Sequence, residues 1–200
     1  MLRYILTSAC NRDCPYCITR NLADCKESTD RMAIIKLFRT MWCGYSEIML
    51  TGGEPTLHPF FNEILAMSAV LFEKVHLTTA DRDFLRQPQR ELLSSITISM
   101  HDSLDKKSDY FKALELGSSP IPIYASCLPE LFREDDPWFY KDLGFSGLTI
   151  NEEQRNGYPF TMKLPEIENF SIKVNRRGHC MNDTFILPDL SVTTDFTPYL

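Results

Sequence analysis

Apolar residues in the first 151 positions follow two alternating spacings. Short runs with alternating or continuous apolar residues are typical of β-strands, and they occur at residues 2–8, 47–51, 75–79, 95–100, 121–127 and 148–151. Between these runs, apolar residues recur every three or four positions, as they do on one face of an α-helix. Such stretches include residues 34–42, 61–72 and 131–143. The pattern therefore predicts six successive strand–helix units.

Residues that favour helix ends lie at the borders of these stretches. Thr29 or Asp30 is placed to cap the first predicted helix, because a short polar side chain there accepts from free backbone N–H groups. Gly117 lies where a later helix is expected to stop. Pro88 interrupts the third helical stretch, so we expect a short helix there.

Six strand–helix units of this kind predict a parallel sheet, since consecutive parallel strands need long crossovers between them. Right-handed crossovers curl such a sheet in one direction. Because a closed barrel has eight units, we expect an α/β fold with a partial (β/α)₆ TIM-like barrel. Ligands of such sheets bind at the carboxyl ends of the strands.

The last part of the chain has a different pattern. Phe170, Ile172 and Val174 alternate with polar residues, and a second extended run at 184–187 precedes the turn signal Pro188-Asp189. This alternation favours β-hairpins over a further strand–helix unit. We therefore expect a barrel domain at residues 1–154 and a short C-terminal β-hairpin extension, packed on the barrel, at residues 155–200.

Composition narrows the function classes. The 200 residues are 44% hydrophobic, enough for a substantial core. A net charge of −6 argues against a large nucleic-acid interface, which needs a basic face. No apolar stretch has the length that spans a bilayer, and the first residues do not resemble a secretory leader. We expect a cytoplasmic protein without membrane partners.

The most specific motif follows the first predicted strand and reads Cys10-Asn-Arg-Asp-Cys14-Pro-Tyr-Cys17. Three thiols at this spacing can converge on three corners of a cubane iron–sulfur cluster. Such a cluster usually takes four cysteines, so one iron would stay open to another ligand. A zinc site with Cys25 or a histidine as fourth ligand is the alternative, although a second Cys or His pair of the usual spacing is missing. Seven cysteines, an odd number, argue against a disulfide framework.

A second motif, Met-Leu-Thr-Gly-Gly-Glu-Pro at residues 49–55, follows the second predicted strand. With both motifs in this order, the chain resembles the radical S-adenosylmethionine (radical SAM) enzymes. The resemblance implies an oxygen-sensitive [4Fe–4S] cluster held by Cys10, Cys14 and Cys17, with SAM on the open iron. It also implies reductive cleavage of SAM to a 5′-deoxyadenosyl radical, which removes a hydrogen atom from a peptide or small-metabolite substrate.

The resemblance also implies roles for cofactor-binding residues. Tyr16 would lie against the adenine of SAM, with loop packing as the alternative. Gly52 and Gly53 would let the backbone approach the ligand, and Glu54 would accept a hydrogen bond from the SAM ammonium group. Three residues at the ends of later strands complete the set: Thr79 as a loop contact, Ser99 at the ribose and Asn151 at the adenine or as a turn residue.

The remaining cysteines and basic residues carry weaker expectations. Cys43 and Cys127 lie in apolar runs and are expected in the core. Cys180 begins a segment similar to the auxiliary-cluster extension of radical SAM enzymes, but no cysteine follows it and Leu190 replaces the turn glycine. Arg12, Arg20 and Lys26 would form a basic face that docks a flavodoxin or ferredoxin electron donor, or one that is merely solvated.

The sequence leaves the substrate open. The resemblance to peptide-maturing and molybdopterin-pathway relatives favours a peptide or small metabolite. A glycyl-radical-enzyme activase is one alternative, although Ile18-Thr19 stands where His-Asn is frequent. A 7-carboxy-7-deazaguanine synthase is another, since Thr19 matches its magnesium-binding threonine, although its typical amino-terminal Gly-Glu-Gly is missing. A non-catalytic iron–sulfur carrier or a zinc-binding module would not need the second motif.

Overall fold

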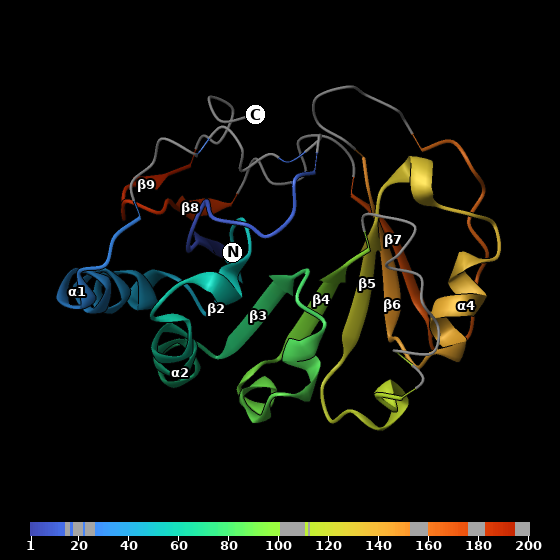
Figure 1. The fold of residues 1–200 in the computed structure, drawn as a ribbon, viewed down its shortest axis with the longest axis horizontal. Coiled ribbons are helices and arrows are strands. Elements are labelled where there is room, and N and C mark those ends of the chain that lie inside the picture. Colours follow the sequence, from blue (N-terminus) through green and yellow to red (C-terminus); the bar gives the residue numbers. More distant parts are fainter. Residues whose placement is uncertain are drawn as a thin grey trace.

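One mixed sheet organises the protein (Figure 1). The computed structural model describes residues 1–14, 17, 22, 27–100, 111, 113–152, 160–175 and 183–194. Within them, the strands are β1 (Leu2–Ile5), β2 (Glu47–Thr51), β3 (Lys74–Thr79), β4 (Ser95–Ser99), β5 (Ile123–Cys127), β6 (Gly147–Asn151), β7 (Ser171–Asn175), β8 (Thr184–Ile186) and β9 (Val192–Thr193). Their spatial order is β7-β6-β5-β4-β3-β2-β1-β8-β9.

The central six strands confirm the predicted partial barrel. β1 to β6 lie in chain order and every neighbouring pair is parallel, as the strand–helix repeat requires. The sheet is open, because β7 and β9 form its two edges and do not pair with each other. The carboxyl ends of all six strands therefore lie along one side of the sheet, which Figure 1 shows at the top of β3 to β6.

Three α-helices and several 3₁₀ turns connect the described strands. The helices are α1 (Arg31–Met41), α2 (Phe61–Leu71) and α4 (Asp136–Asp142). The 3₁₀ turns are η2 (Trp42–Gly44), η3 (Pro55–Leu57), η4 (Asp83–Arg86), η5 (Pro88–Leu92), η7 (Leu116–Ser118) and η8 (Pro129–Leu131). None of the helices in the described ranges is both long and apolar enough to cross a membrane.

Local chemistry explains where these helices begin. Asp30 caps α1 as predicted, because its Oδ1 accepts from the N–H groups of Met32 (2.9 Å) and Ala33 (3.1 Å). Between β3 and β4, two 3₁₀ turns on either side of Gln87 replace the predicted helix, since Pro88 cannot continue one. The helix predicted from residue 131 begins only at Asp136, because Pro137 is tolerated in the first turn but not inside a helix. The helix predicted before Gly117 lies mostly outside the described residues.

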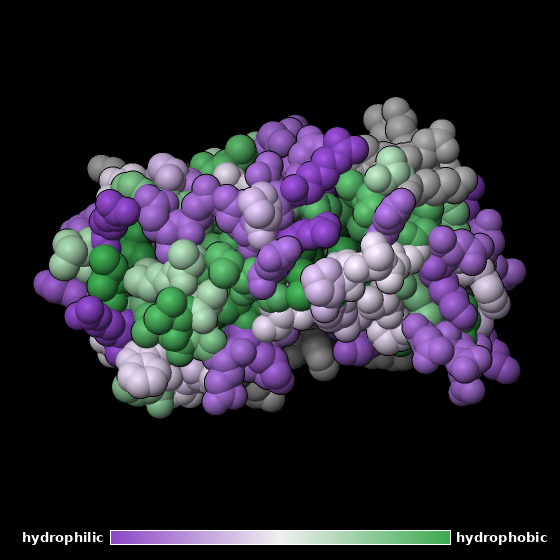
Figure 2. All heavy atoms as spheres, turned by 90° about the horizontal axis from the view of Figure 1, so that it is seen from below, coloured by the Kyte–Doolittle hydropathy of each residue, from purple (hydrophilic) through white to green (hydrophobic). Residues whose placement is uncertain are grey.

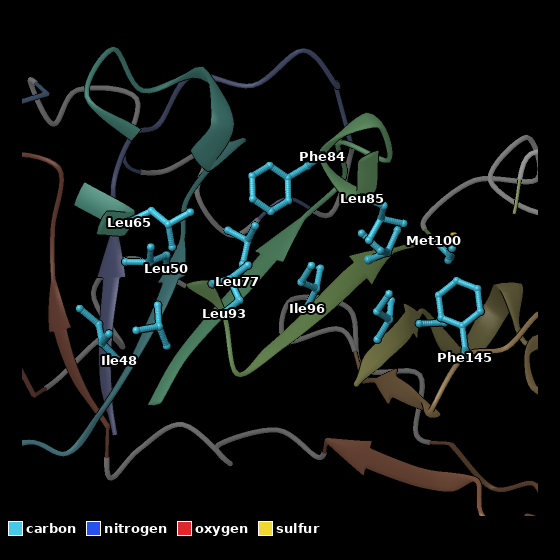
Figure 3. Packing of buried hydrophobic residues seen from close by; sticks show 14 of the residues in the cluster. Ile48, Leu50, Leu65, Leu77, Phe84, Leu85, Leu93, Ile96, Met100 and Phe145 are labelled. Atoms are coloured by element: carbon cyan, nitrogen blue, oxygen red, sulfur yellow. The ribbon is translucent and has the colours of Figure 1, made fainter. Parts of the chain in front are cut away.

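The core lies between the sheet and its helices. Alternate strand residues such as Ile48, Leu50, Leu77 and Ile96 are fully buried and contact one another across the strands (Figure 3). The residues between them along β2, β3 and β4 are polar or half-buried. The helices therefore cover one face of the sheet, the outer face, which is apolar. Seen from below, polar and apolar side chains mix on the surface over this layer (Figure 2).

The C-terminal region departs in part from the prediction. The hairpin is confirmed, since β8 and β9 are antiparallel and a turn with Leu190 at φ 69° joins them. Strand 171–175 was expected to belong with the hairpins, and this was wrong: β7 pairs parallel with β6 at the opposite edge of the sheet. Ile172 and Val174 pack against the core, so the same alternation fits a half-covered edge strand. The domain boundary at residues 154–155 stays a prediction.

Strand β8, near the end of the described residues, contacts the first strand of the chain. β8 pairs parallel with β1, and Asp183 accepts from the Arg3 guanidinium (Nε, 2.5 Å) and lies 3.1 Å from the amino group of Met1. Residues 180 positions apart in the sequence are thus joined beside β1. The hairpin therefore shields the edge of β1, which would otherwise be an exposed strand edge.

The buried imidazole of His58 predicts how stability depends on pH. Its Nδ1 accepts from the N–H of Phe60 (3.1 Å), and Glu27 Oε1 lies 3.5 Å from its Nε2. Burial lowers the pKa of His58 below its usual 6.5, and the charge of Glu27 opposes this only in part. As the pH falls, the unfolded state therefore protonates His58 at a higher pH than the folded state does. We expect a stability that is constant above about pH 6.5 and falls as the pH drops below it.

Urea unfolding between pH 7.5 and 5 measures this slope, which one proton limits to about 1.4 kcal/mol per pH unit. His58→Asn keeps an acceptor for Phe60 but cannot titrate, so it should flatten the slope. His76 serves as comparison, because burial also lowers its pKa and His76→Asn should remove a separate part of the slope. An unchanged slope in His58→Asn would contradict the assignment.

Candidate functional site

Backbone hydrogen bonds join the two sequence motifs at the carboxyl ends of β1 and β2. The N–H of Gly53 donates to Thr7 O (2.7 Å), and the N–H of Glu54 donates to Ala9 O (2.8 Å). These bonds continue the β1–β2 pairing beyond the last paired residues and end one residue before Cys10. The cysteine loop thus begins directly beside the Gly-Gly-Glu-Pro turn.

Glycine is required in this turn by close approach of the backbone. A Cβ atom at Gly53 would lie 2.3 Å from Ala9 O and 2.7 Å from Ser8 O. A Cβ atom at Gly52 would lie 2.7 Å from Thr7 O. Real Cβ atoms do not come this close to backbone oxygens, so both glycines are needed to bring residues 7–9 against the turn. Their predicted contact with a ligand stays a prediction.

The carboxylate of Glu54 is buried and bonded by protein donors. Only 1% of the residue is exposed. Oε1 accepts from Thr56 N (3.2 Å), Thr56 Oγ1 (2.8 Å) and Thr79 Oγ1 (2.6 Å), while Oε2 accepts from Ala80 N (2.8 Å). A carboxylate offers about four lone-pair positions. Glu54 therefore ties the end of β2 to the end of β3, and its acceptors are largely taken up by this bracing.

Thr79 takes part in the same brace. It shares the outer face of β3 with Val75 and Leu77, and 2% of it is exposed. Its Oγ1 donates to Glu54 and accepts from the N–H of Asp81 (2.9 Å). The predicted cofactor-binding residue is thus placed behind the loop, where its hydroxyl positions backbone, while neighbouring Thr78 faces the opposite side of the sheet.

The cysteine loop lies against the loop that follows β3. The Arg12 guanidinium donates through Nη2 to Ala80 O (3.3 Å), and Cys17 N donates to Cys14 O (3.1 Å). Residues from these two loops line a hollow of about 330 Å³: Asn11, Arg12, Ala80, Asp81, Arg82 and Asp83. This hollow opens beside the predicted cluster ligands.

A small apolar cluster anchors the far end of the same loop. Leu22 is fully buried and packs with Ile5 of β1, Phe185 of β8 and Leu187. The cluster is separate from the main core. It ties a residue downstream of Cys17 to the face of β1 and β8 that the helices do not cover.

The three thiols have the chemistry of cluster ligands. Cys10 is exposed, Cys14 and Cys17 are half-exposed, and none of them forms a disulfide. Three accessible sulfur donors from one loop fit an iron–sulfur cluster, which is held by thiolates. No three Cys, His, Asp or Glu side chains in the described ranges are grouped closely enough to hold a metal ion. Convergence of Cys10, Cys14 and Cys17 therefore stays a prediction. Tyr16, Cys25 and Cys180 lie outside the described residues.

The other predicted residues divide between the two faces of the sheet. Ser99 and Asn151 lie on the face that the helices leave uncovered, at the carboxyl ends of β4 and β6. Asn151 Nδ2 donates to Ser126 Oγ (2.6 Å), and its Oδ1 accepts from Asn175 Nδ2 (2.8 Å). Ser126 and Asn175 were not predicted. The sequence signal that could have found them is the alternation of polar and apolar residues along β5 and β7, which places both side chains on the uncovered face.

The two cysteines expected in the core behave differently. Cys127 is buried at the end of β5, as predicted. Cys43 is exposed, and its prediction was wrong because the chain leaves α1 through the 3₁₀ turn Trp42–Gly44, in which no residue is buried.

The brace of Glu54 predicts a stability difference between two adjacent threonines. Thr79→Val removes the hydroxyl that donates to a buried carboxylate, so we expect a loss of about 2 kcal/mol in the free energy of unfolding. Thr78→Val is the matched control, since within the described residues the Oγ1 of Thr78 has only a weak contact with Met49 Sδ, at 3.5 Å. It should cost less than about 0.5 kcal/mol. Equal losses in urea unfolding would show that Glu54 does not depend on Thr79.

Comparison with known proteins extends these observations. Residues 4–118, more than half of the chain, match the Radical SAM superfamily. Molybdenum cofactor biosynthesis protein 1 of Bos taurus is 29% identical over 221 residues, covering 86% of this chain and 35% of the relative. GTP 3′,8-cyclase of Stenotrophomonas maltophilia is 35% identical over 116 residues, covering 53% of this chain and 35% of the relative. The chain thus spans about a third of the length of these relatives.

The fold is also shared with solved structures. Streptococcus suis SuiB aligns with a TM-score of 0.71 at 12% identity, over 97% of this chain and 59% of SuiB. SuiB bound to S-adenosylmethionine aligns equally well, with a TM-score of 0.71 at 11% identity. At these identities the likeness concerns the fold. Together with the family match and the two motifs, these findings show that the chain belongs to the radical SAM superfamily, a family of enzymes that use a [4Fe–4S] cluster and SAM.

Proposed function

We propose that this protein is an enzyme that cleaves SAM reductively and abstracts a hydrogen atom from a peptide or small-metabolite substrate. The observation that carries this proposal is the backbone pairing of residues 7–9 with Gly53 and Glu54. It brings the start of the Cys10–Cys17 loop to the Gly-Gly-Glu-Pro turn at the carboxyl ends of β1 and β2. Ligands of α/β sheets bind at the carboxyl ends of the strands.

Three cysteines would hold the cluster in this proposal. Cys10, Cys14 and Cys17 supply thiolates from one loop, and a fourth protein ligand is not needed when SAM takes the open iron. When bound and reduced, the cluster supplies the electron that divides SAM into methionine and a 5′-deoxyadenosyl radical. The residues of the protein orient the bound molecules and exclude solvent.

Several residues would position SAM. The Gly52-Gly53 backbone lies against residues 7–9, directly before the cysteine loop, and is proposed to run along the methionine part of SAM. Glu54 and Thr79 would act mainly by fixing this turn and the loop after β3, because their polar atoms already bond to each other. Ser99 and Asn151 are proposed contacts of the ribose and adenine, and Tyr16 is proposed to stack on the adenine.

Two similar proteins support the substrate classes of the proposal, and a basic side chain supports the electron donor. A peptide substrate is supported by the structure of SuiB bound to its precursor peptide SuiA, and a small metabolite by the GTP 3′,8-cyclase relatives. Arg12, which lines the hollow between the cysteine loop and the loop after β3, would contribute to docking an acidic flavodoxin or ferredoxin. A cytoplasmic location would keep the thiols and the cluster reduced.

Anaerobic reconstitution tests the proposal. The protein is loaded with iron and sulfide, reduced, and given SAM, and 5′-deoxyadenosine is measured by chromatography. We expect formation of 5′-deoxyadenosine that depends on reductant and SAM. Cys14→Ala should abolish both the iron–sulfur absorbance and the product. Cys43→Ala is the matched control, because Cys43 is exposed and lies on a separate 3₁₀ turn, so it should retain both.

Two results would contradict the proposal. Protein isolated anaerobically with tightly bound zinc and no capacity for iron would support the zinc-binding alternative. In the second result, the wild-type protein forms a cluster that accepts electrons and yet leaves SAM intact when a peptide or a small metabolite is added. That result would support a non-catalytic carrier. Equal activity of Cys14→Ala and Cys43→Ala would show that the loop does not hold the cluster.

A further inference from the structure

Backbone hydrogen bonds fix the chain on both sides of the cysteine loop. Before the loop, Ala9 O accepts from the N–H of Glu54 (2.8 Å). After the loop, the chain passes through Glu27 and Ser28 shortly before helix α1. The N–H of Ser28 donates to Pro188 O (2.8 Å), in the turn that joins β8 to β9. The side chain of Glu27 lies at this second attachment.

The imidazole of His58 faces Glu27 with its donor nitrogen. Its Nδ1 accepts from the N–H of Phe60 (3.1 Å), so in the neutral ring the proton is on Nε2. Nε2 lies 3.5 Å from Glu27 Oε1, and the imidazole is fully buried. No hydrogen bond satisfies Nε2 within the described part of the chain. A buried N–H of this kind needs an acceptor, and the carboxylate of Glu27 is in place to supply one.

The hydroxyl of Tyr4 is a second buried donor beside the same carboxylate. Tyr4 belongs to β1 and is fully buried, with its ring 5.6 Å from that of Phe38 in α1, centroid to centroid. Its hydroxyl has no hydrogen-bond partner among the described residues. Burial raises the pKa of Tyr4, and the negative charge of Glu27 raises it further. Two unpaired donors, one from β1 and one from the turn after β2, thus lie near one carboxylate.

The segment from Glu54 to His58 connects the two ends of the loop. It contains the 3₁₀ turn η3 and is closed by two internal backbone hydrogen bonds of 3.0 and 3.1 Å. Its first residue holds Ala9, and its last residue faces Glu27. Fixing both ends of a loop removes conformational freedom in advance, so ligand binding to the loop costs less entropy.

We propose that Glu27 is a positioning residue of the cysteine loop, and that its carboxylate fastens the end of the loop to His58 and Tyr4. A movement of about 0.5 Å by the Glu27 side chain brings the Nε2–H of His58 within hydrogen-bond distance. The second motif then acts on the loop from Gly52 as far as His58. The inference rests on the proposed function only in assigning an iron–sulfur cluster to the three cysteines. Glu27 acts on that cluster through the loop and is not a ligand.

The groups around His58 provide a matched control. Glu27, the backbone of Ser28 and the carboxylate of Glu63 all favour the protonated imidazole, with Glu27 the strongest of the three. Glu63 lies on α2, where it pairs with Arg31 (3.1 Å), and both side chains are exposed. Glu63 is therefore a carboxylate that also acts on His58 but does not fasten the cysteine loop.

Iron release from the reconstituted protein tests the role of Glu27. The cluster-loaded protein is mixed anaerobically with bathophenanthroline disulfonate, without SAM or reductant, and the absorbance of the iron chelate is followed. We expect Glu27→Ala to release iron about tenfold faster, as the loss of a hydrogen bond to a charged group does. Glu27→Gln keeps an acceptor oxygen, so its release should stay within about threefold of the wild type. Glu63→Ala should match the wild type.

A double-mutant cycle separates this anchor from a general loss of stability. His58→Asn keeps an acceptor for Phe60 but removes Nε2, so it should also release iron about tenfold faster. Because both changes break one contact, His58→Asn combined with Glu27→Ala should be no faster than either change alone, whereas independent effects would multiply to about a hundredfold. Tyr4→Phe removes only the hydroxyl and should speed release in the same direction.

Histidine titration by proton NMR tests the contact in the metal-free full chain. The signal of His58 is assigned by its loss in His58→Asn. Glu27→Gln should lower the pKa of His58 further, and Glu63→Gln should lower it less. The proposal is overturned if Glu27→Gln leaves this pKa unchanged, if Glu27→Ala retains iron like the wild type, or if the two effects multiply. A protein that shows the titration shift but takes up no iron would overturn the proposed function and leave the Glu27–His58 contact standing.

Discussion

The backbone contact between residues 7–9 and the turn at Gly52–Glu54 is the constraint on which the site depends. Two hydrogen bonds of 2.7 and 2.8 Å hold it, and the absence of Cβ atoms at Gly52 and Gly53 makes it sterically possible. The buried carboxylate of Glu54 then transmits the position of this turn to the end of β3. Three loops at neighbouring strand ends are thus fixed to one another before any ligand binds. Such preorganisation reduces the cost of assembling a site around a cofactor.

Glu54 shows how a residue predicted to bind a ligand can have its acceptors occupied by the fold. The resemblance to radical SAM enzymes predicted that its carboxylate accepts a hydrogen bond from the SAM ammonium group. The four donors around it are backbone and hydroxyl groups of this chain. Taking a carboxylate out of water is costly unless hydrogen bonds replace those of the solvent. The brace meets that need, and it fixes the Gly52-Gly53 backbone against residues 7–9.

The strand–helix order was predictable because each signal was local. Alternation in Glu47–Thr51 and Ser95–Ser99, the cap at Asp30 and the break at Pro88 act within a few residues. The place of β7 was not predictable. Alternation in Ser171–Asn175 fits both a hairpin and a half-covered edge strand, and only contacts distant in sequence decide between them. The exposure of Cys43 was missed because an apolar run does not reveal where a helix ends in a 3₁₀ turn.

The same limit applies to the inner face of the sheet, which the helices leave uncovered. The hydroxyl and amide side chains of β4 to β7 are scattered in the sequence, and each one alone is an ordinary polar residue. The parallel register lines them up, and the row from Asn175 to Ser126 exists only because Asn151 lies between the two. A closed barrel would fill this face with branched apolar residues. An open sheet that keeps the face polar gives up that packing, so its hydroxyl and amide groups must find partners in one another, in water or in a hydrogen-bonding ligand.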